Sequence, residues 1–83
     1  MIRYGLPTVW IEDGIRIVVN TLDHLPAHVH CYVAGKVVIV LLEPDVQVRG
    51  KARGLPAGEV HRVLALVRAN RGYLSRQWKR LHP

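Results

Sequence analysis

The amino-acid sequence predicts an α+β fold in which an antiparallel meander of four to five strands is covered by one or two C-terminal helices. Residues 8–50 contain short apolar runs separated by turn residues, the pattern of β-strands. Residues 56–81 change to the 3.6-residue period of amphipathic helices. The chain has 83 residues, of which 49% are hydrophobic and 22% are charged, so we expect residues 1–83 to form a single domain.

Two hairpins account for the first four predicted strands. Alternating apolar residues flank Asp13-Gly14, and Asp-Gly between two β-rich runs favours a tight hairpin turn. A second hairpin is predicted where residues 28–33 reach Ala34-Gly35 and the apolar residues 36–42 return beside them. A proline then interrupts the pattern, and two valines within residues 46–48 predict a short final strand.

The helical part is predicted to cover the sheet with one apolar face and to break near its middle. Arg71 would lie inside the apolar face, and Gly72 follows it, so we expect two short helices with a break between residues 70 and 72. The residues predicted on the apolar face are Val60, Val63, Leu64, Val67, Leu74, Trp78 and Leu81. Trp10 is also expected in the core, because large aromatic side chains supply much of the burial in a small domain.

The net charge of +6 is distributed unevenly along the chain. Residues 1–48 carry three basic and five acidic side chains, whereas residues 49–83 carry nine basic side chains and one acidic one. Such clustering predicts a polyanionic partner, either nucleic acid or an acidic protein, although a solvated surface that aids solubility is the alternative. The candidate binding residues are Arg62, Arg68, Arg76, Lys79 and Arg80.

The cysteine content and the apolar runs predict a cytoplasmic protein without a membrane segment. Cys31 is the single cysteine, so the chain cannot form an internal disulfide or a zinc site of several thiolates. Residues 1–7 lack the basic start and the apolar core of a secretory signal. The longest apolar run, residues 37–42, is far shorter than the roughly 20 residues of a transmembrane helix.

Three of the five histidines, His24, His28 and His30, lie within seven residues. On a strand, residues i and i+2 point to the same face, so His28 and His30 can converge while Val29 and Cys31 face the other way. The two imidazoles could act as general base and general acid, or they could bind a divalent metal with His24 as third ligand and water as fourth. The third alternative is a structural role with hydrogen bonds to the backbone. Apart from such a metal ion, we expect no cofactor.

The histidines belong to a longer pattern that resembles a known family. The Asp-His-x-Pro-x-His-x-His signature at residues 23–30 is joined by Asp-Gly-Ile-Arg-Ile-Val-Val at residues 13–19, by the turn at residues 34–36 and by the Asn-Arg-x-x-Leu-x-x-x-Trp helix within residues 69–78. Together they resemble the small prokaryotic proteins catalogued as domain of unknown function 4160. The chain departs from that family at residue 27, where a second proline is common, and in a final helix that is basic here and commonly acidic elsewhere.

The resemblance implies a role in a toxin–antitoxin module. Members of the family are similar to components of such modules and are usually encoded beside a second small protein that would act as the antitoxin. The resemblance therefore implies the toxin side and a small acidic partner encoded nearby. It supplies no catalytic residues, so His24, His28 and His30 enter only as positions that match the signature.

Three hypotheses about function follow. The first is a ribonuclease-like toxin that acts on RNA or on the translation apparatus, with the basic C-terminal half contacting phosphate. Its mechanism would resemble metal-free RNA cleavage, in which one imidazole deprotonates a 2′-hydroxyl and an arginine stabilises the charged transition state. The second is a non-enzymatic module that docks an acidic partner protein. The third is a metal-dependent enzyme built on the three histidines. Because so short a chain buries little surface, it would also gain stability as a homodimer.

Overall fold

The computed structural model describes residues 8–83, and the expectation about a secretory signal in residues 1–7 lies outside this range. Five strands precede two helices along the chain, which confirms the predicted α+β order. The elements are β1 (Thr8–Glu12), β2 (Ile15–Val19), β3 (His28–Val33), β4 (Lys36–Leu41), β5 (Gln47–Val48), α1 (Ala57–Ala69) and α2 (Arg71–Leu81).

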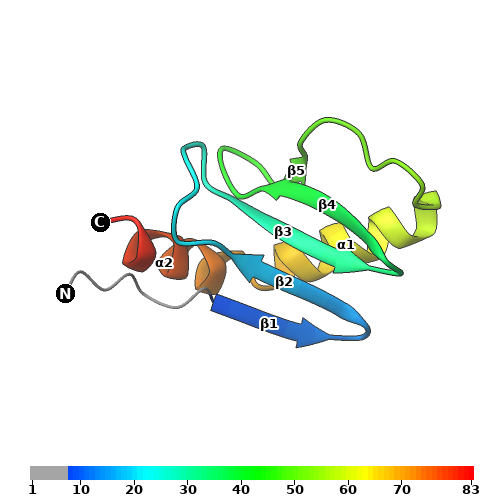
Figure 1. Ribbon diagram of the computed structural model, residues 1–83, viewed down its shortest axis with the longest axis horizontal. Helices are drawn as coiled ribbons and strands as arrows, with labels where there is room; N and C mark the ends of the chain where they lie inside the picture. Colours follow the sequence, from blue (N-terminus) through cyan, green and yellow to red (C-terminus); the bar gives the residue numbers. More distant parts are fainter. Residues whose placement is uncertain (1–7) are drawn as a thin grey trace.

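The strands form one antiparallel sheet in the order β1-β2-β3-β4-β5, so every strand pairs with its neighbours in sequence. Figure 1 shows α1 behind β3 and β4, with α2 continuing from it toward the end of the sheet where β3 begins. Within residues 8–83, no helix is long and apolar enough to cross a membrane.

The two predicted hairpins close through turns with a left-handed backbone. Asp13 and Gly14 have φ values of 51° and 75°, and Ala34 and Gly35 have φ values of 50° and 73°. Positive φ at both central residues is the property of the type I′ turn, whose twist matches that of the flanking strands. Both turns thereby fix the register, which pairs Glu12 with Ile15 across the first hairpin.

The core lies between the sheet and the helices and takes alternate residues from each strand. Ile17, Cys31 and Val38 are neighbours in register across β2, β3 and β4, and all three are buried. The predicted apolar helix face packs against them. Its buried members are Val63, Val67, Leu74 and Trp78, while Val60, Leu64 and Leu81 are partly buried.

The break between the helices falls at Asn70, as the sequence predicts. The Asn70 side chain donates a hydrogen bond to the Leu66 carbonyl oxygen at 2.9 Å. The next residue, Arg71, leaves the apolar face because its guanidinium donates to the backbone carbonyl oxygens of Leu42 at 2.9 Å and Pro44 at 2.7 Å. Arg71 thus ties the start of α2 to the segment that follows β4.

The face of the sheet turned away from α1 carries several exposed apolar side chains. Val9, Ile11, Tyr32 and Val37 are exposed there, and the guanidinium of Arg16 lies 4.6 Å from the centroid of the Tyr32 ring. By strand alternation, His28 and His30 share this face at the start of β3. His28 nevertheless packs against Trp78 of α2, so the histidine pair lies at the end of the sheet that α2 reaches (Figure 1).

Candidate functional site

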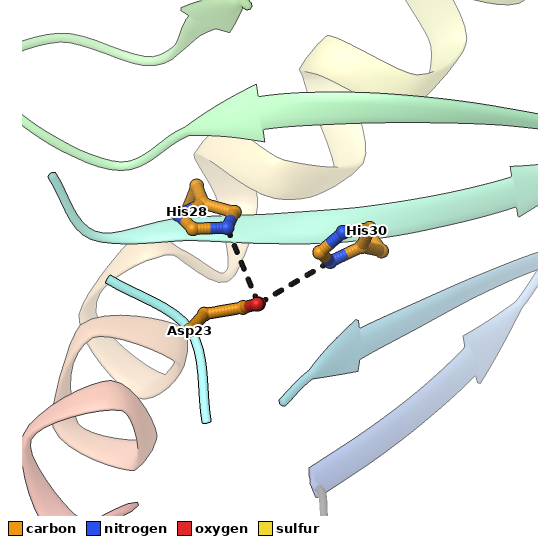
Figure 2. A group of neighbouring side chains, drawn as sticks. All are labelled: Asp23, His28 and His30. Carbon is orange, nitrogen blue, oxygen red and sulfur yellow. Dashed lines mark ion pairs between the residues drawn. The ribbon is translucent and has the colours of Figure 1, made fainter. Parts of the chain in front are cut away.

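Asp23, His28 and His30 converge at the start of β3, and we call these three residues the Asp23 cluster. The Asp23 Oδ2 atom lies 3.2 Å from His28 Nε2 and 3.6 Å from His30 Nδ1 (Figure 2). One potential ligand atom from each residue lies within 4.8 Å of those of the other two. Among residues 8–83, this is the only group of three or more histidine, cysteine or acidic side chains close enough to share a metal ion.

Local structure explains how the cluster forms. The i, i+2 spacing on β3 places both imidazoles on one face, as predicted, with ring centroids 5.4 Å apart. The connection from β2 to β3 then folds back so that Asp23 faces the two rings (Figure 2). The Leu42 amide donates to the carbonyl oxygen of buried Ala27 at 2.9 Å, which anchors the end of this connection to the sheet.

His28 is the buried member of the cluster, with only 4% of its surface exposed. Its Nδ1 atom lies 2.8 Å from the carbonyl oxygen of Pro26, and its ring centroid lies 5.2 Å from that of Trp78 on α2. A carbonyl oxygen only accepts hydrogen bonds, so Nδ1 carries the proton and donates it. The ring is therefore held by contacts on both nitrogens and on one face.

His30 is the accessible imidazole of the cluster, with a side chain that is 19% exposed. Its Nδ1 atom lies 3.0 Å from Asn20 Nδ2. An amide nitrogen only donates, so this ring nitrogen accepts and carries a lone pair. Asp23 Oδ2 lies 3.6 Å from the same nitrogen.

Asp23 is the site residue that is not among the candidates predicted from the sequence. Its side chain is 26% exposed, yet its Oδ2 atom is buried and receives no hydrogen bond from the described residues. The available signal was the first position of the signature itself, because a carboxylate precedes the paired histidines by five and seven residues. Aspartate is an ordinary metal ligand and an ordinary partner of imidazole.

His24 does not join the other two histidines. Its side chain is exposed, and it belongs to no group of potential ligands in the described part of the chain. Residues 23 and 24 are adjacent in an irregular loop, and only the side chain of Asp23 faces β3. The potential metal ligands that lie together in the described part of the chain are Asp23, His28 and His30, and the predicted third ligand, His24, is not among them.

Cys31 lies on the opposite side of β3 and cannot contribute to the site. The residue is fully buried in the core, and burial raises the pKa of its thiol from 9.0 to about 12. A thiol of that pKa has almost no thiolate at neutral pH, and the thiolate is the form that attacks electrophiles and binds metals.

The five candidate binding cations fall into two groups. Arg62 donates to the Asp13 carbonyl oxygen at 2.6 Å and to the Glu59 carboxylate at 2.8 Å. Arg80 donates to the side chains of Gln77 and Thr8. Both arginines therefore already have partners within the protein. The other three candidates, Arg68, Arg76 and Lys79, are exposed and form no hydrogen bond or ion pair with another described residue. Those three remain available for a partner.

Comparison with known proteins places the whole site within one family. Residues 14–79 match the family described as Domain of unknown function (DUF4160). The chain belongs to this family. The matched segment of the DUF4160 domain includes the Asp23 cluster, Trp78 and nearly all of α2. No curated protein and no solved structure matches the chain.

Proposed function

We propose that this DUF4160 protein is the toxin of a two-component module and that it acts on RNA. In this proposal, the Asp23 cluster is the reacting centre, and the free cations of the helical layer bind phosphate. A small acidic protein encoded nearby neutralises the toxin by covering the same basic surface. The toxin role is inferred from the family resemblance, whereas the RNA target is inferred from the charge and the site.

The observation that carries the proposal is the contact between α2 and the cluster. Trp78 of α2 packs against the His28 ring, so the basic end of this helix lies beside the Asp23 cluster. The sequence of α2 contains four basic side chains and no acidic one. Arg76 and Lys79 are three residues apart and share an exposed face. A polyanion bound there would pass close to the cluster.

The chemistry that fits this arrangement is transfer of an RNA phosphodiester to its own 2′-oxygen. The 2′-hydroxyl loses its proton at the cluster, the 2′-oxygen bonds to phosphorus, the bond from phosphorus to the 5′-oxygen breaks, and the leaving oxygen gains a proton from water. The charge that develops on the phosphoryl oxygens would be offset by Lys79 or Arg76. His30 is the accessible imidazole, so it is the one that can contact the substrate.

The proposal is tested by growth and RNA cleavage together. Induced expression of the wild type should arrest bacterial growth, and the purified full chain should cleave RNA. Asp23→Asn and His30→Gln should each lower cleavage by about 100-fold or more, because acid–base groups contribute on that order, and both should keep their melting temperatures. His61→Gln changes an exposed histidine on α1 and serves as the matched control. No cleavage by the wild type, or full cleavage by both variants, would reject an RNA-cleaving toxin.

One observation favours a second candidate, a non-enzymatic module that docks an acidic partner. His28 is buried, and both of its nitrogens face atoms of the protein, as expected of a structural histidine. In that case, Asp23→Asn and His30→Gln should bind the partner as tightly as the wild type, whereas replacing Arg76 and Lys79 together should weaken binding. Pull-down of the adjacent gene product with each variant separates the two candidates.

A further inference from the structure

We propose that Asp23, His28 and His30 bind one divalent transition-metal ion, with Zn²⁺ as the ion that suits this donor set best. The inference deepens the proposed function by naming a cofactor for the same site, and it rests on that function only for what the ion does to RNA. Binding of the ion depends on the geometry of the three side chains alone.

The free lone pair of His28 faces the carboxylate of Asp23. His28 donates its Nδ1 proton to the Pro26 carbonyl oxygen, so the neutral ring carries a lone pair on Nε2, which faces Asp23 Oδ2 at 3.2 Å. His30 Nδ1 also lies near Asp23 Oδ2, at 3.6 Å, but its one lone pair accepts from Asn20, so an ion bound at this nitrogen would displace the Asn20 N–H. The lone pair of His28 Nε2 and the carboxylate oxygen of Asp23 therefore face each other, an arrangement that is repulsive unless a cation lies between them.

A proton on His28 does not account for the arrangement. Asp23 Oδ2 is buried and has no hydrogen-bond partner among residues 8–83, so the contact of 3.2 Å with His28 Nε2 lacks the direction of a hydrogen bond. A buried carboxylate oxygen without a donor is costly. One metal ion would satisfy that oxygen and the His28 lone pair and would take the His30 lone pair in place of the Asn20 N–H, whereas one proton can satisfy a single pair of atoms.

The surroundings of His28 are those of a metal ligand. A ligating histidine almost always donates its second ring N–H to a carbonyl or carboxylate, and the Pro26 carbonyl oxygen receives that bond here. Trp78 packs against the ring and fixes its orientation. Neighbouring groups that fix the orientation of a histidine ring in this way are typical of metal sites.

The donor set defines the class of ion. Two imidazoles and one carboxylate suit zinc and neighbouring transition metals, whereas magnesium and calcium prefer oxygen ligands alone. Three protein ligands also leave a coordination position for solvent or a substrate oxygen, which is the pattern of catalytic zinc sites. An ion there would draw electron density from the 2′-oxygen of bound RNA and promote loss of its proton.

The test uses the untagged full chain, freed of metal with a chelator and titrated with Zn²⁺ in competition with a chromophoric chelator. The wild type should bind one equivalent, and its melting temperature should rise with free Zn²⁺, because the ion binds the folded chain. Asp23→Asn and His30→Gln should each weaken Zn²⁺ binding by at least tenfold. His24→Gln is the matched control: it removes an exposed histidine next to Asp23 and should bind Zn²⁺ as the wild type does.

Three results would overturn the assignment: no saturable binding by the wild type, wild-type affinity in Asp23→Asn, or an equal loss in His24→Gln. His28→Gln would be less informative, because the buried ring also packs against Trp78, so the two more exposed ligands decide the question. All of these measurements are made without RNA. A chain that binds Zn²⁺ through these residues but cleaves no RNA would support the metal site and reject the proposed function, and RNA cleavage without Zn²⁺ binding would do the reverse.

Discussion

At the scale of single residues, the alternation along β3 places neighbouring side chains in two different environments. His30 lies at the Asp23 cluster, and Cys31 lies in the core between Ile17 and Val38 of the adjacent strands. Burial disfavours the charged thiolate of Cys31 and raises the pKa of the thiol to about 12. Adjacent residues of one strand thus contribute side chains to the polar site and to the apolar core.

The raised pKa of Cys31 predicts a specific loss of stability in alkali. In the unfolded chain, the thiol titrates near its ordinary value of 9.0, so between pH 9 and 12 the unfolded state binds fewer protons than the folded state. The free energy of unfolding should therefore fall above pH 9, by up to about 1.4 kcal/mol per pH unit from this group. Urea denaturation of the wild type and Cys31→Ala from pH 8 to 10.5 measures the effect. If both lose stability with the same slope, Cys31 is not the cause.

Residue-level details of the site were only partly predictable from sequence. The pairing of His28 and His30 follows from strand periodicity and is confirmed. The choice between Asp23 and His24 as third member could not be predicted in this way, because these residues lie in an irregular loop with no period. That choice depends on how the loop folds back over β3, which in turn depends on contacts far apart in the sequence.

At the scale of elements, the helical layer is joined to the sheet by one side chain as well as by the core. Arg71 begins α2 and donates to the carbonyl oxygens of Leu42 and Pro44. The break at this position can be predicted from the sequence, because a basic residue cannot continue an apolar face, but the partners of the guanidinium cannot. Periodicity indicates which side chains cannot lie on the apolar face of a helix, whereas the groups that these side chains contact depend on the tertiary structure.

Replacing Arg71 should therefore destabilise the protein more than replacing other basic residues of the helices. Arg71→Ala leaves the backbone carbonyl of buried Leu42 without its side-chain donor, and an unsatisfied buried group costs about 1 to 3 kcal/mol. Arg68→Ala is the matched control, because that exposed side chain has no described partner and its loss should change stability by about 0.5 kcal/mol or less. Urea denaturation gives both values. Equal losses in the two variants would show that the Arg71 contacts contribute nothing.

At the scale of the whole molecule, the positive charge is concentrated in one layer of the fold. The strands come from the nearly balanced first half of the chain, and the helices come from the basic second half, so one layer of the fold carries most of the positive charge. This layered arrangement follows directly from two patterns in the sequence, the switch from a strand period to a helix period and the charge asymmetry. The same asymmetry concentrates positive potential on the helical layer, where it can attract a polyanion.

The helical layer should therefore bind single-stranded RNA with an affinity that falls steeply as salt rises. Each phosphate neutralised by a cation releases counterions, and for single strands each contact contributes about −0.7 to the slope of log K against log salt. Replacing the free cations Arg76 and Lys79 together with glutamine should weaken binding and make that slope less steep by about 1.4, which is two such contacts. Arg16→Gln is the control, because Arg16 lies over Tyr32 on the face of the sheet turned away from α1, and its replacement should leave the slope unchanged. Filter binding from 50 to 300 mM salt measures all three proteins. A flat salt response in the wild type, or an equal change of slope in Arg16→Gln, would mean that the basic face of α2 is not where phosphate binds.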